Sequence, residues 1–223
     1  MATRRLPSST DNYHHGALRE ALVDAAEALI REQGLEAFTL RECARRAGVS
    51  HAAPAHHFGD ARGLLTACAA AGLERLADTI DGYVSLAPAD DATARLRAGG
   101  QAYIDFALAN RALFQLMFRR DRLDPTDAVL RRAGKRLGDG LREAIAALMA
   151  ERRLPAAELG RRILLAWSLM HGYVTLVLER QAIDLFGLDA DEQATAASEM
   201  GAELLRLLVA GLAQALPADG RAG

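Results

Sequence analysis

The sequence has few cysteines and no long apolar run. Cys43 and Cys68 are its only cysteines and lack CxxC spacing, so we expect no disulfide framework and a reducing compartment. No stretch of about 18 apolar residues occurs, so no membrane span is predicted. The first ten residues, MATRRLPSST, hold two arginines but no apolar core, unlike a secretory signal. These absences predict a cytoplasmic protein without a membrane partner.

Catalytic and metal-site motifs are missing as well. The chain contains no GxSxG, P-loop or GxGxxG pattern, and we expect Cys43 and Cys68 to pack in the core rather than act as nucleophiles. His51 and His56 are five residues apart, whereas ligands on one helical face are three or four apart, and no cysteine pair completes a ligand set. We therefore predict no enzymatic activity, no cofactor and no metal ion.

Alanine and leucine dominate the chain, and β-branched residues are few. Alanine and leucine lose little conformational freedom in a helix, so the composition favours α-helices, and no alternating strand pattern competes. The 223 residues suffice for one large domain or two small ones. We predict an all-α fold, with three N-terminal helices followed by a C-terminal helical bundle and about nine helices in total.

Capping signals set the expected boundaries of the first helices. A helical pattern begins at Gly16 and ends at Gln33-Gly34, and Thr39-x-x-Glu42 predicts a capping box at the start of a short second helix. Ser50 is the expected cap of a third helix. Pro54 then falls at the fourth helical position, where it removes no intrahelical hydrogen bond.

The later helices are separated by Gly59-Asp60 and by a Pro88–Asp91 linker. We expect helices over about 61–84, 91–109, 111–120, 125–151, 156–182 and 189–215.

The second and third helices have the spacing of a helix-turn-helix. Gly48 permits the backbone reversal between them, and Val49 fills the angle that they form. The small side chains of Ala52 and Ala53 let the third helix approach a major groove closely. A plain pair of packed helices has the same spacing, so the pattern alone leaves both interpretations open.

The N-terminal part of the chain resembles the DNA-binding domain of TetR-type transcriptional regulators. The resemblance covers residues 13–76 and is carried by YHHGALREALVDAAEALIREQGLEAFTLRECARRAGVSHAAPAHHFGDARGLL. Downstream, GQAYIDFALANRALFQLMF and WSLMHG are similar to the ligand-binding domain of a TetR subgroup with a Trp-His-Gly signature. The resemblance implies a helix-turn-helix DNA-binding domain over 13–76, a ligand-binding and dimerisation domain over 77–217, and a homodimeric repressor that senses a small molecule.

Two positions depart from the family pattern. TetR-type regulators usually carry tyrosine at the position of Ala55 and lysine at the position of Ala61, and both residues commonly contact DNA phosphates. Phosphate contacts supply much of the affinity for DNA, and Arg62 replaces the lysine only in part. We therefore predict DNA binding that is weaker or more salt-sensitive than is usual in the family.

Candidate DNA contacts lie on the second and third helices and at the start of the fourth. They are Thr39, Arg41, Ser50, His51, Ala52, Ala53, His56, His57 and Arg62. Two pairs of alternatives stay open. His57 either faces a phosphate or packs inward, and Tyr13–His15 form either an arm along the DNA or a disordered tail. Residues 1–62 hold eight arginines and eight acidic residues, so DNA binding here depends on local geometry rather than on a large positive field.

Two stretches rich in aromatic residues and methionine predict an effector site in the second half. Small-molecule pockets are mostly apolar with a few polar groups, a role that suits Tyr103 and His171. The candidate ligand-binding residues are Tyr103, Phe106, Phe114, Met117, Phe118, Trp167, Met170 and His171. The same residues can also fill a helical core, and the sequence does not separate these two uses.

The last two predicted helices are apolar on wide faces, which suggests that they pair with a second copy of the chain. A two-fold dimer fits a palindromic operator with half-sites roughly 34 Å apart. The predicted function is a ligand-responsive transcriptional regulator, a repressor that a small hydrophobic effector releases from double-stranded DNA. The alternative is a helical small-molecule-binding or interaction protein with a degenerate DNA-reading head.

Overall fold

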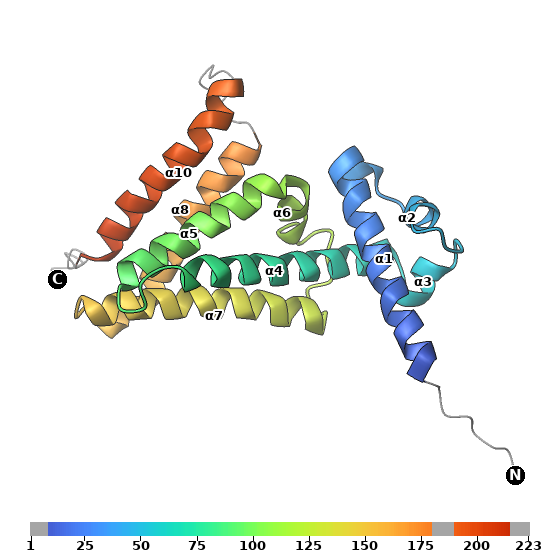
Figure 1. The fold of residues 1–223 in the computed structure, drawn as a ribbon, viewed down its shortest axis with the longest axis horizontal. Coiled ribbons are helices and arrows are strands. Elements are labelled where there is room, and N and C mark those ends of the chain that lie inside the picture. Colours follow the sequence, from blue (N-terminus) through green and yellow to red (C-terminus); the bar gives the residue numbers. More distant parts are fainter. Residues whose placement is uncertain (1–8, 180–189, 215–223) are drawn as a thin grey trace, which may run out of the picture. The chain divides into compact units, whose positions relative to one another are not determined.

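The computed structural model describes residues 9–179 and 190–214, in which all regular structure is helical (Figure 1). The α-helices are α1 (Ser9–Gln33), α2 (Leu40–Arg46), α3 (Ala53–Phe58), α4 (Ala61–Ser85), α5 (Ala92–Ala109), α6 (Arg111–Met117), α7 (Ala128–Glu151), α8 (Leu159–Leu178) and α10 (Ala190–Leu212). Two short 3-10 helices are η1 (Leu35–Ala37) and η2 (Ala156–Glu158). The predicted all-α fold is confirmed. Within the described ranges, no helix is both long and apolar enough to cross a bilayer.

The chain divides into two compact units. The first comprises Met1–Leu73 and Arg111–Ala133, and the second comprises Glu74–Asn110 and Gly134–Gly223. Helix α6 and the loop that follows it therefore belong to the same unit as α1, α2 and α3. Helices α4 and α7 each contribute residues to both units.

In the first unit, α1 packs against η1, α2 and α6, and α2 packs against α3. Leu22, Leu29 and Ile30 of α1 are at most 2% exposed. Each such burial stabilises the fold by about 1.5–3 kcal/mol, whereas an exposed ion pair contributes about 0–1 kcal/mol. The buried apolar stripe of α1 therefore contributes more to the stability of this unit than exposed ion pairs do. Cys43 and Cys68 are also fully buried, as predicted.

Gly72 marks a close approach of α4 and α6. A Cβ atom at this position would lie 2.8 Å from Sδ of Met117 and 3.1 Å from Leu113. Those distances are shorter than ordinary van der Waals contacts, so a larger side chain at this position would displace the side chains of Met117 and Leu113.

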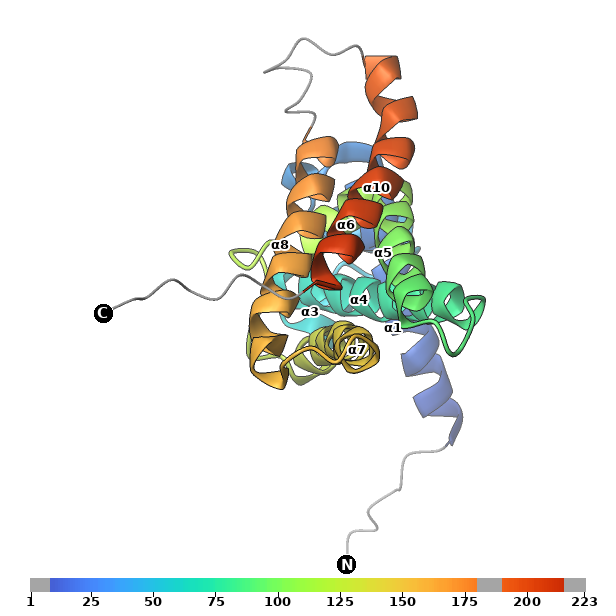
Figure 2. The same ribbon diagram turned by 90° about the vertical axis from the view of Figure 1, so that its left-hand side faces the viewer.

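In the second unit, α5, α8 and α10 pack against one another in pairs (Figure 2). Arg162 of α8 is fully buried and donates hydrogen bonds to the backbone carbonyls of Leu212 and Gln214 and to the carboxylate of Glu158. A cation at a helix C-terminus satisfies carbonyls without intrahelical partners and complements the helix dipole. Arg162 thus caps α10 and holds its end on α8.

The first helix starts earlier than the sequence predicted. Helix α1 runs from Ser9, so Tyr13–His15 lie in a regular helix rather than in a disordered tail. Gly16 was expected to mark the helix start, but one glycine costs a helix only about 1 kcal/mol.

Candidate nucleic-acid interface

Helix α2 is capped by the predicted threonine. Oγ1 of Thr39 accepts a hydrogen bond of 3.2 Å from the backbone N–H of Glu42. The Glu42 carboxylate accepts hydrogen bonds from Arg45 and Arg46, which lower its pKa from 4.5 to about 2. The predicted cap is thus confirmed, but among the described contacts Glu42 does not return the reciprocal bond of a full capping box.

The turn between α2 and α3 corrects one sequence prediction. Gly48 has φ of +66°, the left-handed conformation that favours glycine, so the predicted backbone reversal is confirmed. Ser50 is not the cap of the third helix: α3 begins at Ala53, and its N-cap residue is Ala52. Proline is favoured in a first helical turn, so Pro54 moves the helix start toward itself and leaves Ser50 in the turn.

Helix α3 and the turn before it are exposed on one side. In the turn His51 and Ala52 are exposed; on the helix Pro54 is buried, Ala55 and His56 are exposed, and Ala53, His57 and Phe58 are half-buried. The guanidinium carbon of Arg19 lies 5.1 Å from the centroid of the Phe58 ring, a cation–π contact between α1 and the end of α3. The exposed face is therefore built from small side chains and imidazoles on a helix that α1 and α2 support.

The arginines near α2 differ in their surroundings. Arg46 forms an ion pair of 2.6 Å with Glu32 of α1 and a second of 3.0 Å with Glu42, and Arg45 pairs with Glu42 at 2.6 Å. These carboxylates offset the positive charge of both arginines. Thr39 and Arg41 are exposed at the start of the same helix.

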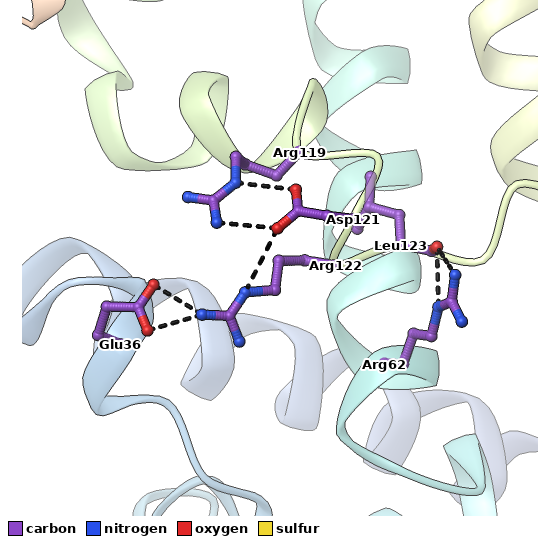
Figure 3. A network of polar contacts seen from close by, with 6 residues as sticks. All are labelled: Glu36, Arg62, Arg119, Asp121, Arg122 and Leu123. Carbon is purple, nitrogen blue, oxygen red and sulfur yellow. Dashed lines mark hydrogen bonds and ion pairs between the residues drawn. The ribbon is translucent and has the colours of Figure 1, made fainter.

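The start of α4 follows Gly59, which has φ of +79°, and Asp60, whose Oδ1 accepts a hydrogen bond of 2.8 Å from the N–H of Gly63. Ala61 is exposed. The guanidinium of Arg62 donates from Nε and Nη2 to the carbonyl oxygen of Leu123, at 2.8 and 2.6 Å (Figure 3). Sequence reasoning missed this contact, because Leu123 lies 61 positions away and no local pattern pairs an arginine with a distant backbone carbonyl.

The candidate ligand-binding residues fall into both compact units. Phe114, Met117 and Phe118 belong to the first unit, where the Phe114 and Phe118 rings have a centroid separation of 5.0 Å. The second unit holds the remaining five, which are Tyr103, Phe106, Trp167, Met170 and His171.

Three of these side chains in the second unit are in contact. The Tyr103 hydroxyl lies 2.8 Å from Nδ1 of His171, and the Trp167 and His171 rings have a centroid separation of 5.7 Å. Burial raises the pKa of Tyr103 and lowers that of His171, so the pair is neutral near pH 7. Trp167 is 46% exposed.

Two family models match the chain. The model for bacterial regulatory proteins of the tetR family matches residues 22–68, and the model for the tetracyclin repressor-like C-terminal domain matches residues 96–200. The chain belongs to the TetR family. The first match covers the helix-turn-helix that α2 and α3 form in this TetR-family chain.

Known relatives of this TetR-family chain differ in how much of it they cover. The HTH-type transcriptional regulator BetI of Yersinia pestis (strain Pestoides F) is 31% identical over 94 residues, which is 42% of this chain and 48% of that protein. BetI of Rhizobium meliloti (strain 1021) is 38% identical over 107 residues, 48% of this chain and 45% of that protein. The matches thus span about half the length of these curated relatives.

A solved structure is similar over most of the chain. It is a protein with unknown function from Rhodococcus sp. RHA1, with 35% identity and a TM-score of 0.70 over 91% of this chain and 98% of that one.

Several large apolar residues of this TetR-family chain are exposed on α8 and α10. They are Leu164, Leu165, Trp167, Leu169 and Leu176 on α8, and Met200 and Leu207 on α10. The apolar face of the last helix was predicted to pair with a second copy of the chain. In the structure, Leu205, Leu208, Val209 and Leu212 on that face are buried. Most of the apolar face of α10 is therefore used within its own unit, where α10 packs on α5 and α8.

Proposed function

We propose that this chain is a cytoplasmic, homodimeric transcriptional regulator that binds a palindromic operator in double-stranded DNA. The exposure of α3 and of the turn before it carries the proposal: His51 and Ala52 in the turn and Ala55 and His56 on the helix are exposed, while Pro54 is buried. A helix with small exposed side chains can enter a major groove, because alanine methyls approach the bases closely and imidazoles donate hydrogen bonds. We assign DNA binding to residues 13–76, and ligand binding and dimerisation to residues 77–217.

The proposed DNA contacts follow this exposure. Thr39 and Arg41 bind phosphates, and base or backbone contacts come from Ser50, His51, Ala52, Ala53, His56 and His57. Arg62 is left out of this set, because the Leu123 carbonyl already accepts two of its hydrogen bonds.

The proposed dimer forms through α8 and α10. Leu164 is 61% exposed and Leu207 is 65% exposed, and leucines at such exposure gain free energy when a second copy covers them. A two-fold dimer presents two copies of α3 to two half-sites, which is why the operator is palindromic.

The proposed effector is small and mostly apolar. Tyr103 and His171 are its polar contacts, and Phe106 and Met170 lie buried in the same unit. Trp167, His171 and Gly172 support assignment to the subgroup with the Trp-His-Gly signature. Effector binding here would favour a conformation with lower affinity for the operator and thereby release the repressor.

One observation favours a second candidate function. Ala55 and Ala61 are exposed without a polar group, and the carboxylates of Glu32 and Glu42 offset the charge of Arg45 and Arg46. With these cations offset, the second candidate is a helical small-molecule-binding or interaction protein whose helix-turn-helix no longer binds DNA.

Binding to DNA from upstream of its own gene separates the two functions. Fluorescence anisotropy of labelled fragments at several salt concentrations, followed by footprinting, measures affinity, specificity and site symmetry. A regulator gives a two-fold footprint and binds specific DNA roughly a thousandfold or more tighter than unrelated DNA. Equal binding to all fragments, or no binding to any fragment, supports the second candidate, in which the helix-turn-helix no longer reads DNA.

A further inference from the structure

One peptide group joins the start of α4 to the α6–α7 loop, which comprises Phe118–Asp127. The carbonyl oxygen of Leu123 accepts hydrogen bonds from Arg62, and the N–H of the same peptide group, at Asp124, donates to Oγ1 of Thr66 at 2.9 Å. The Thr66 hydroxyl in turn donates to the Arg62 carbonyl at 2.7 Å. Both polar groups of this peptide are thus bound by α4 residues one helical turn apart.

The same loop also reaches η1, just before α2. Nη2 of Arg122 donates to both carboxylate oxygens of Glu36, at 2.7 and 2.6 Å (Figure 3). Asp121 pairs with Arg119 at 3.0 Å, which orders the loop beside this contact. The side chains of Leu123 and Thr66 are buried, at 3% and 2% exposed, and the hydrogen bonds of the Leu123–Asp124 peptide group are partly buried.

We propose that Arg62 and Thr66 are positioning residues that fix the direction of α4 against the α6–α7 loop, and that Arg62 makes no phosphate contact. This inference rests on the proposed function, since it concerns the contacts that keep the helix-turn-helix in the orientation needed to bind DNA. Only Gly59 and Asp60 separate α3 from α4, so the direction of α4 sets the direction of α3. Thr66 is too deeply buried to touch DNA, yet it binds the same peptide group as Arg62.

Salt dependence distinguishes positioning from phosphate contact. Each phosphate contact contributes about 0.9 to the slope of log K against log salt concentration, whereas a positioning residue contributes nothing to that slope. The Lys substitution gives a second distinction. Lysine still supplies a point charge to a phosphate, but it cannot place two N–H donors on one carbonyl with the fork geometry of arginine.

The experiment uses the full chain and a DNA fragment that it binds specifically. Anisotropy titrations from 50 to 200 mM salt, well below the melting temperature, compare wild type with Arg62→Gln, Arg62→Lys, Thr66→Val and the Arg62→Gln/Thr66→Val double variant. We expect each to lose about tenfold in affinity with an unchanged salt slope, and the double variant to lose little more than either single one. Arg41→Gln is the matched control for a phosphate contact, with a slope reduced by about 0.9.

A stability control excludes a merely structural effect. Ile30→Val in α1 removes one buried methyl group and is expected to lower the melting temperature, while the folded protein keeps its affinity for DNA. Three results would overturn the proposal. They are an Arg62→Lys affinity equal to that of wild type, a salt slope of Arg62→Gln that is smaller by about 0.9, and an unchanged affinity of Thr66→Val.

A second measurement needs no DNA. Hydrogen exchange of the Asp124 amide is expected to accelerate in both Arg62→Gln and Thr66→Val, because each frees one side of the same peptide group. Unchanged exchange overturns the proposal. If wild type shows no specific DNA binding but the Asp124 amide responds in this way, the proposed function fails while the loop contact stands.

Discussion

The hydroxyl of Tyr103 and Nδ1 of His171 lie 2.8 Å apart, so the two polar groups proposed to hold the effector bind each other. They come from α5 and α8, and 68 positions of sequence separate them. An effector that uses either group must replace this hydrogen bond, so its own polar group has to match the pair in position. Trp167, the only tryptophan of the chain, lies beside His171 and reports on this region by fluorescence.

The first prediction concerns the effector. Tyr103→Phe removes the hydroxyl and keeps the ring, and we expect a roughly tenfold weaker effector affinity with unchanged operator affinity. Quenching of Trp167 by compounds found in a screen of small apolar molecules measures the first quantity. Tyr83→Phe is the matched control, because the Tyr83 hydroxyl binds Asp105 at the surface. Equal losses in both variants would contradict the assignment.

The second prediction concerns pH. Burial lowers the pKa of His171 below its usual 6.5, so the unfolded chain binds a proton more readily than the folded one. The stability that neutral His171 contributes is therefore present above pH 6.5 and is lost as the pH falls through the lower, folded pKa. We expect the stability of wild type relative to His171→Gln, from urea unfolding between pH 8 and pH 5, to decrease as the pH falls. A constant difference would show that His171 does not titrate this way.

The third prediction concerns DNA affinity. Ala55→Tyr and Ala61→Lys add a hydroxyl and a cation at exposed positions, and the resemblance to TetR-type regulators places phosphate contacts there. We expect each change to raise operator affinity several-fold, and the lysine to steepen the salt slope by about 0.9. Ala150→Lys, at an exposed position of α7, controls for added charge alone. If neither Ala55→Tyr nor Ala61→Lys raised the operator affinity, the predicted loss of phosphate contacts would be contradicted.

The fourth prediction concerns the dimer. Leu164→Glu places a charge on the exposed apolar face of α8, where burial in an interface would cost several kcal/mol. We expect a monomer by sedimentation at micromolar concentration, together with a loss of operator binding. Leu86→Glu is the control, because Leu86 is 86% exposed but lies after α4, away from α8 and α10 in the chain. A dimer that survives Leu164→Glu would rule out this face as the interface.

Capping and turn chemistry allowed part of the helix-turn-helix to be predicted. Thr39 caps α2 through an interaction within four residues, and Gly48 adopts a backbone conformation that other residues avoid. The same local reasoning failed at Ser50, where two short-range preferences competed. Serine favours the cap position, but Pro54 favours the first helical turn, and the helix start followed the proline.

The apolar pattern of the last helices was predicted, but its use was not. Periodicity shows which residues of α10 share a face, but it does not show what covers that face. Leu205 and Leu208 are buried, whereas Leu207 is exposed, because α5 and α8 cover only one side of the helix.

The sequence by itself determined the helical fold, the Thr39 cap of α2, the Gly48 turn between α2 and α3, and the resemblance to the TetR family. These features depend on residues close together in the chain, where backbone conformation and side-chain periodicity act directly. Only the tertiary structure decided that Arg62 binds the Leu123 peptide and that Tyr103 binds His171. Such contacts join segments more than 60 positions apart, and their geometry depends on how whole helices pack, which no local pattern encodes.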